Sequence, residues 1–218
     1  GSPSRLEVMQ GVPFLWLRTP AYQGNGVRRL RNMVSFARQV WTGVGSRQLK
    51  RPDAIVGSSP HPLAALAAER MARHLRVPFV LEVRDIWPQS LVDLGGIGER
   101  QLVTRCLERL ERYLYRHADR IISLLPGAVE HIAERGGIRE HVVWIPNGVD
   151  MSLVPPPSQP VDDGVLTVMY AGAHGLANGL DVVLDAAALL QQKGLGERIR
   201  VKLLGDGPEK RRLQHRVR

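Results

Sequence analysis

Charged and imidazole side chains stand directly after two apolar runs in this sequence. Arg84 and Asp85 follow the run PFVLEV at residues 78–83, and His61 follows the run DAIVGSS at residues 53–59. Short apolar runs rich in β-branched residues are typical of strands buried on both faces of a parallel sheet. Ligands of open α/β proteins bind beside the carboxyl ends of such strands. We therefore predict that Arg84, Asp85 and His61 are candidate catalytic residues at one sheet edge.

Each of these side chains also has a purely structural interpretation. An arginine next to an aspartate can pair with it and hold a turn, and a lone histidine is most often a hydrogen-bonded structural residue. Trp87 and Pro88 restrict the loop that follows Asp85, because proline limits its own backbone and that of the residue before it. The residues themselves leave both interpretations open.

Two glycine-rich turns each join an apolar run to a helical pattern, YAGAHGLANGLD at residues 170–181 and GDGP at residues 205–208. Glycine lets the backbone approach a ligand closely, and the helix that follows offers free N–H groups to a phosphate. Asp206 can accept a hydrogen bond from a sugar hydroxyl. Neither turn is a Walker loop or a GxGxxG fingerprint, and ordinary strand-to-helix turns are the alternative. Together the turns favour a phosphate-bearing ligand.

Apolar runs and helical patterns alternate along the chain with short connections, which predicts an α/β fold. Parallel strands need crossover connections, and helices must cover both faces of their sheet. Strands are predicted at residues 12–19, 53–59, 78–83, 118–125, 141–146, 165–172 and 199–205, and helices at residues 27–49, 63–75, 99–117, 127–135 and 180–192 and at the carboxyl end. A glycine turn at residues 24–26 follows the first strand.

A composition shift divides the chain. Residues 154–164, VPPPSQPVDDG, contain four prolines and no apolar periodicity, which is typical of a linker between domains. We expect a first Rossmann-like domain over residues 1–153 and a second that opens at residue 165. Because residues 165–218 supply only two strands, we expect them to be the start of that second domain.

Charge and cysteine content limit the class of protein. The net charge is +9, and residues 1–52 carry nine basic residues against one acidic residue. A second basic cluster closes the chain at residues 210–218, so the neighbour is expected to be a polyanion, either nucleic acid or an anionic bilayer. Cys106 is the single cysteine, which excludes an internal disulfide and predicts a small core residue of a helix. No run of about 18 apolar residues predicts a membrane span, and we expect a cytoplasmic protein.

The helical pattern at residues 27–49 is amphipathic. Its predicted apolar stripe has spacings of three and four, and Arg28, Arg31 and Arg38 lie outside it. One interpretation is a helix packed on the sheet with solvated arginines, and the other is an interfacial helix that touches anionic lipid. The stripe consists of Leu30, Met33, Val34, Ala37, Val40 and Trp41.

Taken together, the motifs EVRDIWPQSL, IPNGVD, YAGAHGLANGLD and LLGDGPEK resemble family 4 retaining glycosyltransferases of the GT-B fold. The nearest branch is related to N-acetyl-L-fucosamine transferases of bacterial surface-polysaccharide and lipopolysaccharide assembly. The resemblance runs from LRTPAYQGNG onward. It implies two Rossmann-like domains, with a nucleotide-sugar donor held mainly by the second and an acceptor mainly by the first.

The resemblance also implies roles for individual residues. Arg84 falls where many relatives have a histidine near the transferred sugar. The glycines of residues 170–181 lie beside the donor diphosphate in the family, and residues 205–208 lie near the nucleoside. This chain has Ala173 and Asn178 where relatives have an arginine and a lysine, so His174 and Asn178 become substitute donors. The implied donor-binding residues are Gly172, His174, Asn178, Gly179, Gly205, Asp206 and Gly207.

The implied activity is transfer of a sugar from a nucleoside diphosphate, expected to be UDP, with retention at the anomeric carbon. No metal or other cofactor is expected, and the acceptor is lipid-linked or a polysaccharide at the inner face of a bacterial membrane. The family's first strand and the rest of its donor domain are expected outside residues 1–218, which predicts impaired transfer by this chain alone.

Two other functions stay open at this stage. Another GT-B nucleotide-sugar enzyme, such as an epimerase, is disfavoured by the linker and by EVRDIWP. A basic nucleic-acid-binding module is disfavoured because the arginines are not interleaved with aromatic residues, so no nucleic-acid partner is expected.

Overall fold

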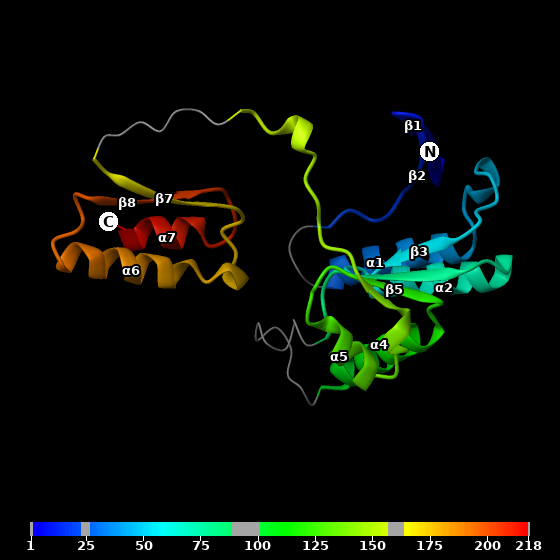
Figure 1. Cartoon of the computed structure of the whole chain (residues 1–218). Helices are drawn as coiled ribbons and strands as arrows, with labels where there is room; N and C mark the ends of the chain where they lie inside the picture. Colours follow the sequence, from blue (N-terminus) through cyan, green and yellow to red (C-terminus); the bar gives the residue numbers. More distant parts are fainter. Residues whose placement is uncertain (1, 23–26, 89–100, 157–163, 218) are drawn as a thin grey trace. The chain divides into compact units, whose positions relative to one another are not determined.

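The computed structural model describes residues 2–22, 27–88, 101–156 and 164–217, which fall into two compact units (Figure 1). The units are Gly1–Val149 and Asp150–Arg218. The predicted turn at residues 24–26, residues 89–96 of the motif that contains Arg84, and most of the predicted linker lie outside the described residues. Each unit is α/β with parallel strands, and the predicted α/β fold is thereby confirmed.

The first unit is built on a four-stranded parallel sheet. Its strands are β3 (Ile55–Ser58), β4 (Phe79–Val83), β5 (Arg120–Ser123) and β6 (Val142–Trp144), in that spatial order. Each strand lies within a predicted apolar run. Such runs are typical of parallel strands, because strands in the interior lose most of their contact with water. The register places Ser58 opposite Glu82 and Ser123 opposite Val83, so the carboxyl ends of β3, β4 and β5 share one edge.

The core of this unit lies on one face of the sheet. Phe79, Leu81 and Val83 alternate along β4 and pack with side chains of α2 (Pro62–Leu75), α4 (Leu102–His117) and α5 (Ala128–Glu134). The intervening Val80 and Glu82 are only half-buried, so β4 is fully buried on one face of the sheet, and the prediction of full burial on both faces is wrong for this strand.

One predicted core residue of helix α4 lies outside the core. Cys106 is exposed, whereas Thr104, Glu111, Leu114 and Tyr115 are buried. The predicted role of Cys106 as a core residue is therefore wrong. The carboxylate of Glu111 is buried on this helix, and its burial is compensated by hydrogen bonds that it accepts from the Tyr115 hydroxyl at 3.0 Å and from an arginine of the segment after α5 at 2.8 Å.

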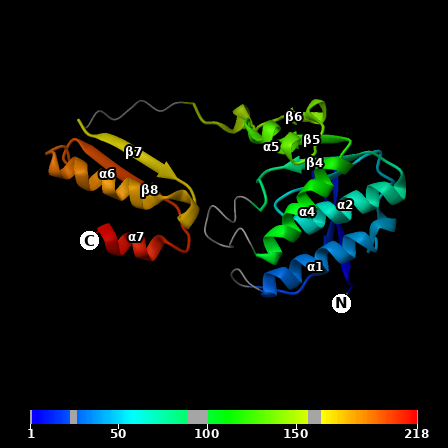
Figure 2. The same cartoon turned by 90° about the horizontal axis from the view of Figure 1, so that it is seen from below.

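Helix α1 (Val27–Trp41) ends about two turns before the predicted residue 49. Gly43 and Gly45 follow it with positive φ, which an α-helix cannot accommodate. The helix packs beside α2, and α2 lies beside α4 (Figure 2). The predicted apolar stripe is not buried as a whole, because Leu30 is 54% exposed and Trp41 is 59% exposed.

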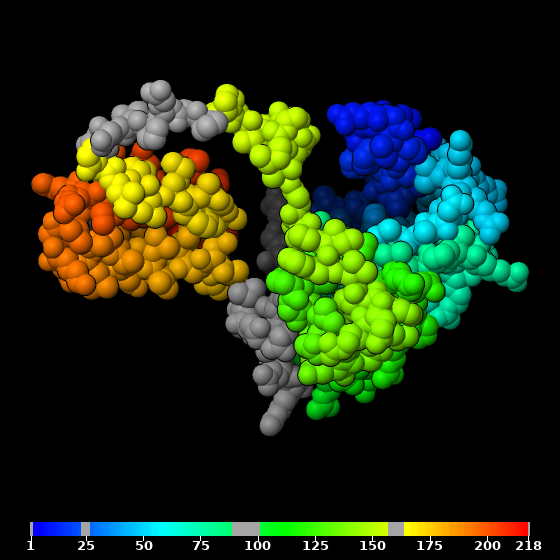
Figure 3. All heavy atoms as spheres, in the orientation of Figure 1, coloured from blue at the N-terminus to red at the C-terminus, as the bar shows by residue number. Residues whose placement is uncertain are grey.

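A β-hairpin opens the described chain. Strand β2 (Val12–Leu17) was expected from its sequence, but β1 (Ser4–Met9), which pairs with it antiparallel, was not. Gln10 and Gly11 join the strands and both have positive φ, as a two-residue primed turn requires. A Gln-Gly pair is a weaker turn signal than Asn-Gly, which explains the missed strand. The hairpin stands at the surface of the first unit (Figure 3, dark blue).

The second unit has two parallel strands and two helices. The strands are β7 (Leu166–Ala171) and β8 (Ile199–Leu204), and the helices are α6 (Leu180–Gln192) and α7 (Lys210–Val217). The register places Ala171 opposite Leu204, so both glycine-rich turns leave the sheet at the same edge. The predicted bounds of β7, β8 and α6 agree with the structure to within one residue, and α7 is the helix that was predicted at the carboxyl end without bounds.

A core substitution tests the architecture of the first unit. We expect Leu81→Ala to lower the free energy of unfolding by about 2–5 kcal/mol, because this side chain is fully buried in the core. Leu102→Ala removes the same atoms from a side chain that is 73% exposed, and a change within about 0.5 kcal/mol is expected. Urea unfolding followed by circular dichroism measures both, and equal losses would contradict the assigned core.

Candidate functional site

The carboxyl edge of the first sheet holds the turn that contains Arg84 and Asp85. Ser59 follows β3, and its Oγ accepts hydrogen bonds from the backbone N–H of Arg84 at 2.9 Å and of Asp85 at 3.3 Å. The same hydroxyl donates to the carbonyl of Asp85 at 3.3 Å. The backbone N–H of Ser59 donates to the carbonyl of Glu82 at 2.9 Å and continues the parallel ladder. Ser59 therefore fixes where the two charged side chains leave the sheet.

The side chains of Arg84 and Asp85 are exposed at this edge. Within the described part of the chain, they make no ion pair with each other. The turn is held through backbone groups by Ser59, so the alternative of an Arg–Asp clip does not describe how the turn is built. Ser59 was missed from the sequence because a serine after a strand is common and carries no charge signal.

His61 caps the amino end of α2. Its Nδ1 accepts a hydrogen bond from the backbone N–H of Ala64 at 2.9 Å, so the neutral ring carries its proton on Nε2. Nε2 is buried and has no hydrogen-bond partner among the described residues. Burial lowers the pKa of His61 and the charge of Arg29 acts in the same direction, whereas the carbonyl groups of His61 and Met33 act against them.

This geometry limits the chemistry open to His61. A neutral ring whose Nδ1 is already occupied is suited to donate a hydrogen bond from Nε2 and is not suited to act as a base. His61 and the Arg84–Asp85 turn leave neighbouring strands at one edge. The structure thus brings His61, Arg84 and Asp85 to the same edge of the sheet. His61 also has a structural role as the cap of α2.

In the second unit, backbone hydrogen bonds join the two glycine-rich turns. The N–H of Gly172 donates to the carbonyl of Leu204 at 2.9 Å, and the N–H of His174 donates to the carbonyl of Asp206 at 2.8 Å. The carbonyl of His174 accepts from the N–H of Glu209 at 3.0 Å. The parallel ladder therefore continues past the strand ends, and the two turns form one surface.

The glycines of the second turn are required by this contact. A Cβ atom at Gly205 would lie 1.8 Å from the carbonyl oxygen of Gly172, and one at Gly207 would lie 2.5 Å from the carbonyl oxygen of His174. Gly179 differs, because it has positive φ at the start of α6 and nothing within 4 Å of a Cβ position. Loop-to-loop packing thus explains Gly205 and Gly207, and the positive φ explains Gly179.

The substitute donors predicted in the first turn lie in different settings. The Asn178 Oδ1 accepts from the N–H of Gly175 at 3.3 Å, which shapes the turn. His174 is only 4% exposed, and neither of its ring nitrogens has a hydrogen-bond partner among the described residues. Asp206 is exposed and its Oδ1 accepts from the N–H of Gly207 at 2.8 Å.

The side-chain carboxylate of Asp181 joins the two helices of the second unit. Asp181, in the first turn of α6, accepts a hydrogen bond from Arg212 of α7 at 2.9 Å and another from Arg216. Arg216 also pairs with Asp185. Two arginines of the basic cluster at residues 210–218, which had suggested a polyanionic partner, therefore contact carboxylates of the chain itself.

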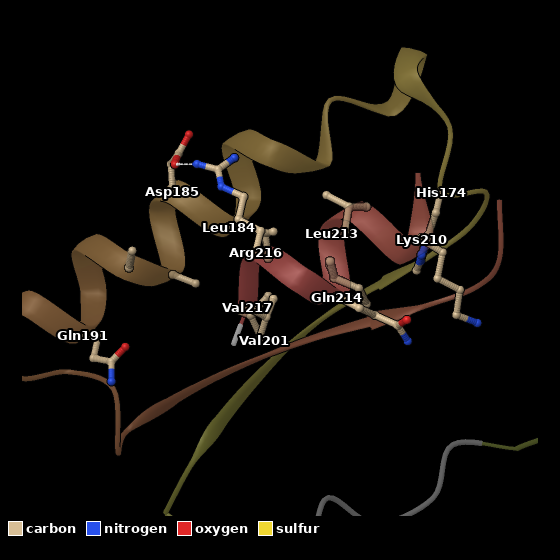
Figure 4. Close-up of a pocket in the computed structure, with 13 residues that line it drawn as sticks. His174, Leu184, Asp185, Gln191, Val201, Lys210, Leu213, Gln214, Arg216 and Val217 are labelled. Atoms are coloured by element: carbon tan, nitrogen blue, oxygen red, sulfur yellow. Dashed lines mark hydrogen bonds and ion pairs between the residues drawn. The ribbon is translucent and has the colours of Figure 1, made fainter. Parts of the chain in front are cut away.

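A cavity of about 690 Å³ lies between α6, α7 and β8 (Figure 4). Val201 and Leu203 of β8 and Leu213 of α7 line it with apolar groups. His174 is the one predicted site residue on its lining. We place the candidate donor surface at the joined turns, at the end of the cavity that His174 lines, because parallel α/β sheets bind ligands at the carboxyl edge.

Three further observations concern cations and membranes. Among the described residues, no group of three or more His, Cys, Asp or Glu side chains could hold a metal ion. No helix in the described ranges is both long and apolar enough to cross a membrane. Arg28, Arg31 and Arg38 are all exposed on α1, beside the exposed apolar side chains of the same helix.

Two α/β units, each with polar groups or glycine turns at the carboxyl ends of its parallel strands, agree with the architecture of proteins of the GT-B fold. The chain belongs to the family of glycosyl transferase 4-like domains, which matches residues 1–148. It is 23% identical over 166 residues to the probable glycosyltransferase WbjE of Pseudomonas aeruginosa, across 72% of this chain and 40% of WbjE.

Solved structures support the fold. Alr3699/HepE of Anabaena in complex with UDP-glucose is similar with a TM-score of 0.56 at 16% identity, covering 88% of this chain and 50% of HepE. The same protein in complex with UDP and glucose gives a TM-score of 0.56 at 16% identity, with 90% and 50% covered. The chain thus spans about half or less of the length of these relatives.

The Asp181 cluster predicts a pH dependence. Hydrogen bonds from Arg212 and then Arg216 hold the pKa of Asp181 well below its ordinary range. A lowered folded-state pKa adds stability above the ordinary value of about 3.9, and this stability is lost as the pH falls below it. We expect Asp181→Asn to lower the melting temperature at pH 7, and the difference from the unaltered chain to shrink steadily below about pH 4.

Asp206→Asn is the matched control for this prediction. Its carboxylate is exposed and lies at the same sheet edge, but it makes no guanidinium contact among the described residues. Thermal unfolding at several pH values measures all three proteins. A loss in Asp181→Asn that is the same at pH 7 and pH 3 would contradict the ionised contact.

Proposed function

We propose that this chain takes part in transferring a sugar from a nucleoside diphosphate to a lipid-linked or polysaccharide acceptor, with retention at the anomeric carbon. Glycosyl transfer follows the family to which the chain belongs. The observation that supports the donor class is the joined pair of glycine turns after β7 and β8. A UDP-linked donor is proposed because the HepE structures contain UDP-glucose or UDP and glucose.

The proposed division of labour follows the two units. The donor diphosphate lies against the turns of the second unit, near Gly172 and Gly179, with Asp206 accepting from a sugar hydroxyl. Arg84 and Asp85 of the first unit face the transferred sugar and the acceptor, and His61 donates a hydrogen bond from Nε2. Ser59 positions the backbone that carries both charged residues.

The proposed chemistry depends on position and charge. As the bond between the sugar and the diphosphate breaks, negative charge grows on the leaving phosphate, and donors fixed before the reaction stabilise it. The acceptor hydroxyl must stand on the same face of the sugar for retention, which a pre-formed site achieves by orientation. The exposed guanidinium of Arg84 is suited to orienting the sugar and the acceptor, because its planar fork of N–H donors holds hydrogen-bond partners in a fixed geometry.

The acceptor side is proposed to be a membrane surface. Arg28, Arg31 and Arg38 stand on α1 beside Leu30 and Trp41, which are exposed apolar residues. A basic helix with an apolar face lies in the plane of an anionic bilayer. We propose a peripheral position at the inner face of a bacterial membrane, with a lipid-linked intermediate of surface-polysaccharide assembly as acceptor and N-acetyl-L-fucosamine or a related sugar as the transferred group.

The donor proposal predicts a specific nucleotide. In thermal unfolding of this chain, UDP is expected to raise the melting temperature in a saturable way. At a UDP concentration of 100 times the dissociation constant, the free energy of unfolding is expected to rise by about 2.7 kcal/mol. GDP and dTDP serve as matched ligands that differ only in the nucleoside. Stabilisation by GDP or dTDP but not UDP would contradict the UDP donor, and no response to any of the three would contradict donor binding.

The membrane proposal predicts an effect of α1. Replacing Arg28, Arg31 and Arg38 with glutamine is expected to weaken binding to vesicles rich in phosphatidylserine about 100-fold, since each basic residue near the surface contributes about 1 kcal/mol. The control replaces Arg105, Arg109 and Arg112, three exposed arginines of α4, with the same loss of charge. Vesicle sedimentation measures both, and an equal loss in the two triple variants would contradict a specific role for α1.

A further inference from the structure

Lys210 is a basic side chain that folds back over the second glycine turn. It is the first residue of α7, and its Nζ donates a hydrogen bond to the carbonyl of Gly205 at 2.9 Å. The same ammonium lies 3.8 Å from the Oδ1 of Asp206. An ammonium has three donors, so these contacts fix its place without using all its hydrogen-bonding capacity. Its side chain remains 39% exposed.

This position is shared by both turns. The carbonyl of Asp206 accepts from the N–H of His174, and the carbonyl of His174 accepts from the N–H of Glu209, the residue before Lys210. The start of α7 is therefore tied directly to the first glycine turn. A ligand that lies across the two turns meets the ammonium of Lys210 at their junction.

Other cations near this surface are engaged by the chain itself. Arg212 contacts Asp181 and Glu209, and Arg216 contacts Asp181 and Asp185. The first turn supplies no cation of its own, because Ala173 and Asn178 are uncharged. Lys210 lies at the joined turns and differs from these arginines. Among the described residues, its ammonium has only a backbone hydrogen bond and a longer contact to Asp206.

A second observation comes from His174. Its imidazole is 4% exposed and lines the same cavity as Lys210, and Figure 4 shows the two residues as neighbours at one end of it. Both ring nitrogens lack a hydrogen-bond partner within the described ranges. Buried polar groups are nearly always paired, and an exception is a mark of a functional site. The unpaired ring therefore points independently to a ligand beside Lys210.

We propose that Lys210 binds the diphosphate of the nucleotide-sugar donor and supplies the positive charge that Ala173 and Asn178 do not. This inference rests on the proposed function. The ammonium also lies close enough to Asp206 to offset its carboxylate, which would otherwise repel the diphosphate. During transfer, the same ammonium opposes the negative charge that develops on the departing phosphate.

The test compares UDP binding by variants of this chain in isothermal titration calorimetry. Lys210→Ala is expected to weaken UDP binding about 10- to 100-fold, the usual cost of losing a charged hydrogen bond. Lys210→Arg keeps the charge and is expected to retain most of the affinity. Lys193→Ala removes the same charge beyond the carboxyl end of α6, at the opposite edge of the sheet, and is expected to bind as the unaltered chain does.

Salt dependence supplies a readout that a structural role would not change. UDP affinity of the unaltered chain is expected to fall more steeply with salt than that of Lys210→Ala, because one ionic contact is missing in the variant. Lys210→Gln, which removes the charge and keeps most of the length of the side chain, replaces Lys210→Ala if the latter has a lowered melting temperature.

Two results would overturn the inference, and only one of them would also contradict the proposed donor site. If the unaltered chain binds UDP and Lys210→Ala binds it equally well, Lys210 is not a diphosphate ligand, and the proposed function stands. If the unaltered chain shows no saturable UDP binding, both the inference and the proposed donor site fail.

Discussion

Hydrogen bonding between parallel strands is the interaction on which the candidate residues at the strand ends of this chain depend. In a parallel sheet all carboxyl ends reach one edge, and the ladder here continues beyond the strands into the turns. In the first unit it carries Ser59 against the backbone of Arg84 and Asp85. In the second unit it carries Gly172 and His174 against Leu204 and Asp206. Residues from distant parts of the sequence meet because these hydrogen bonds hold the turns of neighbouring strands against each other.

Close backbone contact also decides what the glycines contribute. A glycine-rich turn is readily interpreted as a ligand-binding loop, yet Gly205 and Gly207 have no room for a Cβ because the neighbouring turn occupies that space. Their first role is to let two turns become one surface. The polar groups of that surface, among them Asp206 and Lys210, are the proposed contacts of the donor. Structural and functional interpretations of such a turn are therefore compatible.

Charge balance follows a similar logic. The excess of arginine and lysine suggests a polyanion, but part of it neutralises carboxylates within the chain. Arg212 and Arg216 hold Asp181, and Arg135 contacts the buried Glu111, because a buried or clustered carboxylate needs a partner. The arginines of α1 differ, since they stand exposed beside exposed apolar residues. Position in the structure, and not net charge, separates a surface for a partner from an internal ion pair.

The sequence by itself determined the α/β class, the bounds of most strands and helices, and the strand ends at which Arg84, Asp85, His61 and the glycine turns lie. These features depend on local apolar periodicity and on the chemistry of turns, which are properties of neighbouring residues. The tertiary structure alone decided that α4 buries Glu111 and exposes Cys106, and that Leu30 and Trp41 of α1 remain exposed. It also decided that Ser59 and Lys210 join the candidate sites. Those outcomes depend on which side chains meet across elements, and contacts between residues that are distant in the chain leave no periodic signal within either segment.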